Sequence, residues 1–174
     1  MTDIQLPIPL LMGLFAFLAA ILVTDLGSRR IPNSLVLLAI GFSLVFRMAT
    51  EGPGGGLFAG VAGGLAGLAL FLPFYIAGGM GAGDVKAMAA CGCFLGPVQA
   101  LLAAGLTLIA GAVLAIGLVL TRYVALTLPV SHRASGALAG FRSAEGIPYA
   151  AAIVLGCMGS VLLARQGMAN FFGS

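Results

Sequence analysis

Long apolar runs, separated by short polar breaks, make up most of the chain. A helix needs about 20 mostly apolar residues to cross the hydrocarbon core of a bilayer, and several runs approach or exceed that length. This pattern predicts an all-α polytopic membrane protein with about six transmembrane helices. Their expected ranges are 6–24, 35–48, 57–77, 84–95, 98–120 and 147–164.

The breaks between the runs predict the turns. Pro32 prevents simple helix continuation after the first break, and Gly96-Pro97 breaks or kinks the stretch between the fourth and fifth helices. We expect a glycine-rich turn over 50–56 and a polar segment over 121–146. Small residues recur along the third helix at a spacing that allows a close approach by another helix. They are Gly60, Gly63, Gly64 and Gly67.

Charged residues are too few to cover a water-facing surface. Of the 174 residues, 61% are hydrophobic and 7% are charged, whereas a soluble domain carries roughly a quarter charged residues. The net charge of +3 provides no basic face for a nucleic acid, because so few charges are available. We expect a single membrane-embedded domain over 1–174, surrounded by a lipid bilayer and without a nucleic-acid partner.

Positive charges in the breaks set the expected orientation, because cytoplasmic loops carry an excess of Lys and Arg. With six helices and the N-terminus outside, the breaks after the first, third and fifth helices lie in the cytoplasm. Most of the basic residues then fall on that side, while Glu51 falls on the other and is expected to be solvated. The cytoplasmic group is Arg29, Arg30, Lys86, Arg122, Arg133 and Arg142, against Arg47 and Arg165 on the opposite side.

Two aspartates lie at helix ends on the same expected side. Asp25 follows the first helix, and Asp84 begins the fourth. Carboxylates are costly near the hydrocarbon and need a reason. Two neighbouring carboxyl groups share one proton, so that one activates a water molecule while the other hydrogen-bonds the carbonyl oxygen and later protonates the leaving amine. The pair therefore predicts an aspartyl protease. The plainer alternative is a glycine-rich turn with Asp84 as a helix cap.

The helix ends suggest which aspartate does what. The dipole at a helix N-terminus favours a negative charge, whereas the dipole at a C-terminus disfavours it. We therefore expect Asp84 to be the base and Asp25 to carry the proton. Arg29 and Arg30 can reverse this assignment by stabilising an ionised Asp25.

Other residues near the aspartates have expected supporting roles. Gly81 and Gly83 permit backbone angles that other residues avoid, and leave room for a substrate strand. Lys86, like Arg29 and Arg30, anchors lipid headgroups or pairs with an acidic residue of the substrate. No metal or cofactor is expected. Cys91 and Cys93 point to different helix faces, and the single histidine, His132, builds no metal site by itself.

The segments around both aspartates resemble a known family. Residues 81–86, Gly-Ala-Gly-Asp-Val-Lys, are similar to the GxGDxK motif of type IV prepilin peptidases, which are GxGD membrane aspartyl proteases. Residues 25–33 resemble the segment that carries the family's first catalytic aspartate, usually followed by Arg-x-Ile-Pro-Asn or a close variant. Ile147-Pro148-Tyr149-Ala150 is similar to the Pro-Tyr segment near the family's last helix. The three matches occur in the family's order.

This resemblance implies that Asp25 and Asp84 are the catalytic pair of an aspartic-type endopeptidase without cofactor. Such an enzyme removes the short, positively charged leader from prepilins or pseudopilins at the cytoplasmic face of the bacterial inner membrane. Larger members add an N-terminal CxxC domain and N-methylate the new pilin terminus. This chain resembles the short, peptidase-only form of Flp (tight-adherence) pilus systems, so methylation is not expected.

Two alternatives remain at this point. Archaeal preflagellin peptidases share the catalytic pattern. A non-enzymatic small transporter or pilus-assembly protein would use Asp25 and Asp84 for proton binding or helix pairing.

Overall fold

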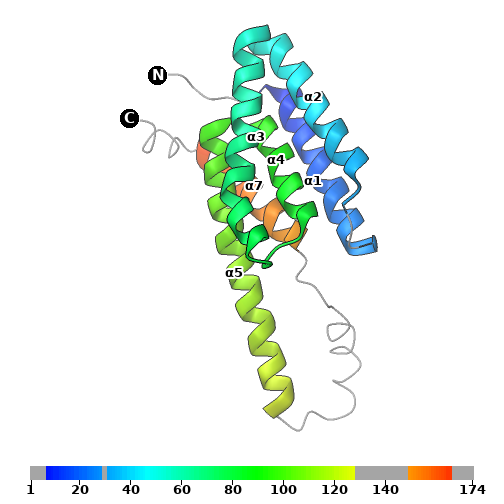
Figure 1. Ribbon diagram of the computed structural model, residues 1–174, viewed down its shortest axis with the longest axis vertical. Coiled ribbons are helices and arrows are strands. Elements are labelled where there is room, and N and C mark those ends of the chain that lie inside the picture. Colours follow the sequence, from blue (N-terminus) through cyan, green and yellow to red (C-terminus); the bar gives the residue numbers. More distant parts are fainter. Residues whose placement is uncertain (1–6, 29–30, 128–148, 166–174) are drawn as a thin grey trace.

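The computed structural model describes residues 7–28, 31–127 and 149–165, and all regular structure in these ranges is helical (Figure 1). The helices are α1 (Ile8–Ser28), α2 (Asn33–Glu51), α3 (Pro53–Ile76), α4 (Ala82–Leu95), α5 (Pro97–Thr127) and α7 (Tyr149–Arg165). Each corresponds to one of the expected helices. The prediction of an all-α fold is therefore confirmed.

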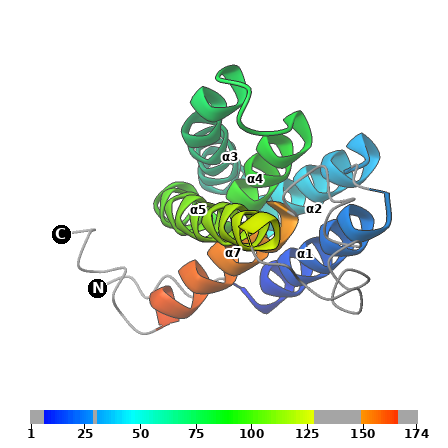
Figure 2. The same cartoon turned by 90° about the horizontal axis from the view of Figure 1, so that it is seen from below.

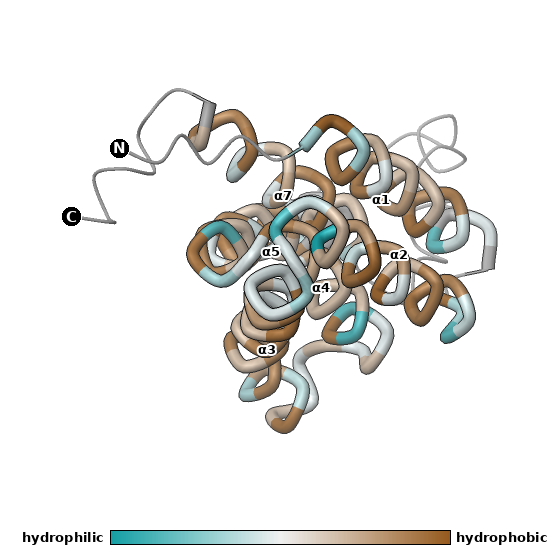
Figure 3. Tube along the Cα trace, turned by 90° about the horizontal axis from the view of Figure 1, so that it is seen from above, coloured by the Kyte–Doolittle hydropathy of each residue, from teal (hydrophilic) through white to brown (hydrophobic). Residues whose placement is uncertain are grey.

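Four helices are long and apolar enough to cross a membrane, namely α1, α2, α3 and α5, and α7 is a shorter apolar helix. Apolar positions dominate the tube in Figure 3, where hydrophilic positions occupy short stretches. Large apolar side chains such as Leu38, Phe58 and Ile109 are exposed on the outer surface. Such a surface suits lipid rather than water, so the chain is a polytopic membrane protein. The outside location of the N-terminus stays a prediction.

The connection between α2 and α3 is much shorter than expected. The predicted turn over 50–56 is wrong, because a single residue, Gly52, separates the two helices. Gly52 has a φ of 85°, a conformation that glycine adopts at little cost. Pro53 then occupies the first position of α3, where its missing amide hydrogen is not needed.

Helix α5 is longer than expected. Its 31 residues span about 46 Å, and its lower end projects past the other helices in Figure 1. The helix continues to Thr127, beyond its expected end at 120 and into the predicted polar segment over 121–146. The rest of that segment lies outside the described residues.

Helix α4 lies at the centre of the bundle and contacts all five other helices (Figure 2). Most of its side chains are buried. They are Val85, Ala87, Met88, Ala90, Cys91, Cys93, Phe94 and Leu95. With 14 residues it is about 21 Å long, well short of the ~30 Å hydrocarbon core. It is therefore a core helix surrounded by protein.

Glycines let α3 approach α4 closely. A Cβ built on Gly67 would lie 2.7 Å from the Met88 carbonyl oxygen, and one on Gly64 would lie 2.6 Å from the Cys93 sulfur. Gly63 and Gly92 face each other backbone to backbone, with no room for a methyl group on either. The predicted small-residue face of the third helix is confirmed.

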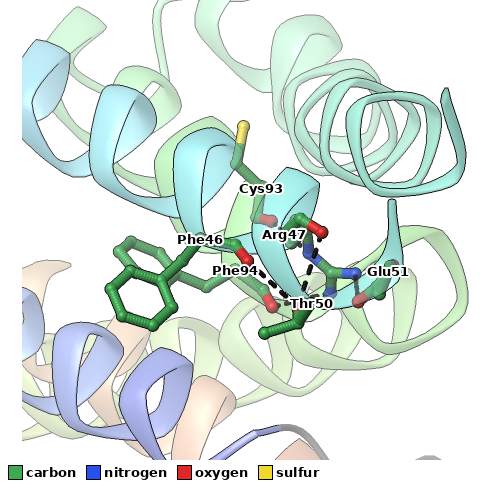
Figure 4. A network of polar contacts seen from close by, with 6 residues as sticks. All are labelled: Phe46, Arg47, Thr50, Glu51, Cys93 and Phe94. Atoms are coloured by element: carbon green, nitrogen blue, oxygen red, sulfur yellow. Dashed lines mark hydrogen bonds and ion pairs between the residues drawn. The ribbon is translucent and has the colours of Figure 1, made fainter. Parts of the chain in front are cut away.

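A buried arginine donates hydrogen bonds to backbone carbonyl groups at the C-terminal end of α4. Arg47 of α2 is 4% exposed, and Figure 4 shows its guanidinium directed at that end. Its Nε donates a hydrogen bond to the Cys93 carbonyl (2.9 Å), and its Nη2 donates one to the Phe94 carbonyl (2.8 Å). Its Nη1 pairs with Glu51 at 2.6 Å. Glu51 is exposed, in line with the expectation that it is solvated, and it also pairs with the arginine that caps α4.

We expect Gly92→Ala to destabilise the fold by about 1–3 kcal/mol, because the new methyl group collides with the α3 backbone. Gly105→Ala in α5 is the matched control, since a Cβ there meets nothing within 4 Å. Denaturant unfolding of the purified variants in detergent measures both. Equal stability of the two variants would contradict the close packing of α3 on α4.

Arg47→Met should be strongly destabilising. It leaves two buried carbonyl groups without donors, at about 1–3 kcal/mol each. Glu51→Gln should cost below about 1 kcal/mol, because the Glu51 side chain is 36% exposed. Thermal unfolding in detergent compares the two, and a smaller effect for Arg47→Met than for Glu51→Gln would argue against the capping role.

Candidate active site

The last turn of α1 and the first turn of α4 meet at one end of the bundle. Asp25 lies in the former and Asp84 in the latter, and both side chains are partly buried. They are close enough for the charge of Asp25 to act on the carboxyl of Asp84. The structure thus brings together the two aspartates that the sequence singled out. Their catalytic role stays a prediction.

Contacts between the start of α2 and α4 hold this end together. The side chain of Ile31 lies beside Gly83, so that a Cβ built on the glycine would be 3.6 Å from the Ile31 Cβ. Lys86 Nζ donates a hydrogen bond of 3.1 Å to Asn33 Oδ1. The Ile-Pro-Asn segment and the GxGDxK-like segment are therefore in direct contact.

Gly81 leaves space beside the Asp84 carboxyl, and its backbone angles are ordinary. Its φ of −75° and ψ of 147° are available to any residue, and Gly83 is not among the positive-φ glycines. The expectation of special angles at these two glycines is wrong. A Cβ on Gly81 would instead lie 3.2 Å from Asp84 Oδ2, because the carboxyl folds back over this residue. The special angle belongs to Gly78, with a φ of 76°, just after α3.

Asp84 lies in the first turn of α4, three residues after the N-cap residue Gly81, where no side-chain cap hydrogen bond is made. The Gly81 backbone nevertheless acts on the Asp84 carboxyl in the direction that lowers its pKa. Asp84 is therefore not the N-cap residue, and the charge of Asp25 beside it needs another explanation.

Burial makes Asp84 harder to ionise. Burial is the largest effect on the pKa of the Asp84 carboxyl, the charge of Asp25 raises that pKa further, and the Gly81 hydrogen bond lowers it. The result is a pKa of about 6, against an ordinary value of 3.8. Burial therefore outweighs the helix terminus, whose dipole by itself favours the ionised form. Which of the two aspartates holds the proton stays a prediction. Asp84 lies outside the four candidate spans.

Tyr149 is a further residue at this end of the bundle. It is the first residue of α7, and the charge of Asp84 acts on its hydroxyl. Tyr149 was not among the site residues expected from the sequence. The resemblance of residues 147–150 to the family's Pro-Tyr segment was the signal that pointed to it. Ile147 and Pro148 lie outside the described residues, as do Arg29 and Arg30.

The cysteines lie in the packed interior. Cys91, Cys93 and Cys157 are buried, and the thiols of Cys91 in α4 and Cys157 in α7 contact each other. Within the described ranges, no group of three His, Cys, Asp or Glu residues is arranged to hold a metal ion.

A helical membrane bundle with paired carboxyls at one end is the class that the fold and site define. Residues 12–116 match the model of the type IV leader peptidase family, and this stretch is more than half of the chain. The chain therefore belongs to the type IV leader peptidase family. The matched stretch includes Asp25 and the segment from Gly81 to Lys86, whereas Tyr149 lies beyond it. No curated protein and no solved structure matches the chain.

The protonated carboxyl of Asp84 should titrate with a midpoint near pH 6. Infrared difference spectra of the wild type and Asp84→Asn isolate its C=O band. Asp25→Asn removes a negative charge that raises the pKa of Asp84, so the midpoint should fall in that variant. It should stay above 3.8, because burial, the larger cause, remains. An unchanged midpoint in Asp25→Asn would show that the two carboxyls do not interact.

Proposed function

We propose that this family member is an aspartic-type endopeptidase that uses Asp25 and Asp84 to remove the leader from type IV prepilins or pseudopilins. The expected substrates are Flp-like prepilins. The expected location is the cytoplasmic face of the bacterial inner membrane. The observation that carries the proposal is the action of the Asp25 charge on Asp84, at the point where the two family-like segments touch.

The proposed reaction needs only a water molecule and the two carboxyl groups. The ionised carboxylate takes a proton from water as the water oxygen attacks the peptide carbonyl carbon. The protonated carboxyl hydrogen-bonds the carbonyl oxygen while negative charge develops there. Its proton then passes to the leaving nitrogen as the carbon–nitrogen bond breaks. The products are a free carboxyl group on the leader and a free amine on the mature protein.

The electrostatics of the site favour Asp84 as the proton carrier and Asp25 as the base. Burial and the charge of Asp25 raise the pKa of Asp84 to about 6, so its proton is retained more readily than that of an ordinary aspartate. This assignment reverses the one drawn from the helix dipoles. The two groups titrate as a pair, and the shared proton belongs to both in the free enzyme.

The basic residues near the site have different proposed roles. Lys86 holds the start of α2 through Asn33, which supports a positioning role rather than a contact with substrate. Arg29 and Arg30 are proposed to anchor lipid headgroups or to meet an acidic residue of the mature pilin.

Cleavage of a purified prepilin in detergent tests the proposal. Asp25→Asn and Asp84→Asn should each lower kcat by a factor of about 10²–10⁴ or more, because each removes one half of the acid–base pair. Glu51→Gln is the matched control, since it neutralises a carboxylate at the opposite end of α2. It should leave the rate within about twofold, in line with the small energy of an exposed ion pair.

Near wild-type cleavage by either aspartate variant would rule out the two-carboxylate mechanism. Absence of prepilin cleavage by the folded wild type, together with proton uptake at the pair, would favour the proton-binding alternative.

A further inference from the structure

We propose that the Tyr149 hydroxyl is a third functional group of this site, donating a hydrogen bond to the scissile carbonyl oxygen as that oxygen becomes negative. The inference rests on the proposed peptidase function and goes beyond its carboxylate pair. It assigns a role to α7, the helix outside the matched family stretch.

The ring of Tyr149 is held in place from two sides. Phe71 of α3, which is fully buried, meets it edge-on with ring centroids 6.4 Å apart at 89°. On the other side the ring rests on Gly111 of α5, where a Cβ would lie 2.7 Å from Tyr149 Oη and 2.8 Å from Cζ. Three helices therefore fix the phenol, and the absence of a side chain at position 111 makes room for it.

The Tyr149 hydroxyl is available as a hydrogen-bond donor. No residue in the described part of the chain accepts a hydrogen bond from Tyr149 Oη, although the charge of Asp84 acts on this group. Tyr149 is only partly buried, so its hydroxyl can donate to water in the free protein. An acceptor supplied by the substrate would take the place of that water at the moment of binding or reaction.

The position next to Asp84 indicates which substrate atom this is. In the proposed reaction, protonated Asp84 hydrogen-bonds the carbonyl oxygen, and Tyr149 is a neighbour of Asp84, since the charge of Asp84 acts on its hydroxyl. The proposal places the oxygen between these two donors. A second fixed donor there stabilises the tetrahedral intermediate, and one such donor is worth a factor of about 10²–10³ in kcat. Tyr149 exchanges no proton in this role, because water and the two carboxyls account for every proton transferred.

Tyr149→Phe is the direct test, assayed on purified full-length protein with the same prepilin substrate. It removes one oxygen and keeps the ring that Phe71 and Gly111 hold. We expect kcat to fall by a factor of about 10²–10³, with KM within about threefold and the unfolding temperature unchanged. Tyr123→Phe is the matched control and should leave kcat unchanged. Tyr123 is 66% exposed, and it lies about 18 Å along α5 from Gly111, the residue that contacts the Tyr149 ring.

The pH profile separates a contact with the carbonyl oxygen from an effect through Asp84. If Tyr149 contacts the oxygen, Tyr149→Phe lowers the whole kcat/KM profile and leaves its limbs in place. A shifted limb with an undiminished plateau would overturn the inference and make Tyr149 a residue that tunes Asp84. A kcat within about twofold of wild type would overturn it as well.

Gly111→Ala provides an independent variant if Tyr149→Phe is poorly folded. It keeps the hydroxyl and displaces it, so kcat should fall while KM changes little. An undiminished kcat would overturn the inference. Cleavage by Asp25→Asn and Asp84→Asn in the same assay distinguishes the two failures, since activity in those variants contradicts the peptidase mechanism itself.

Discussion

The burial of α4 inside a ring of five helices is the constraint on which the rest of the structure depends. In a membrane, every polar group of a buried helix end must find a partner within the protein. At the C-terminal end, Arg47 provides donors for the Cys93 and Phe94 carbonyls. At the N-terminal end, the Gly81 backbone interacts with the Asp84 carboxyl in the first turn. The glycines of α3 are what allow this central helix to be packed so closely.

The same burial gives the site its chemistry. Asp84, in the first turn of α4, is partly buried. Burial and, to a smaller extent, the neighbouring charge of Asp25 raise its pKa to about 6. A carboxyl with such a pKa is suited to hold a proton and release it near neutral pH. The raised pKa that results from burial is thus the property that a two-carboxylate peptidase requires.

Hydrophobic runs and motif spacing were enough to predict the six helices, the small-residue face of α3, and the placement of Asp25 and Asp84 at one end. These features depend on local pattern and chain direction. The α2–α3 connection was missed because one glycine with positive φ replaced a whole turn. The raised pKa of Asp84 was missed because a dipole argument ignores burial. The contacts of Arg47, Gly81 and Tyr149 depend on tertiary packing, which no local pattern encodes.

The most direct test of the central claim is a cross-linking measurement of the distance between positions 25 and 84 in a bilayer. Asp25→Cys/Asp84→Cys, in a chain whose three native cysteines are alanine, should be joined rapidly by a thiol reagent that spans a few ångströms. Asp25→Cys/Glu51→Cys is the matched pair and should not react, because α2 places position 51 about 27 Å from its own start. Equal cross-linking of the two pairs, or none of the first, would contradict the account.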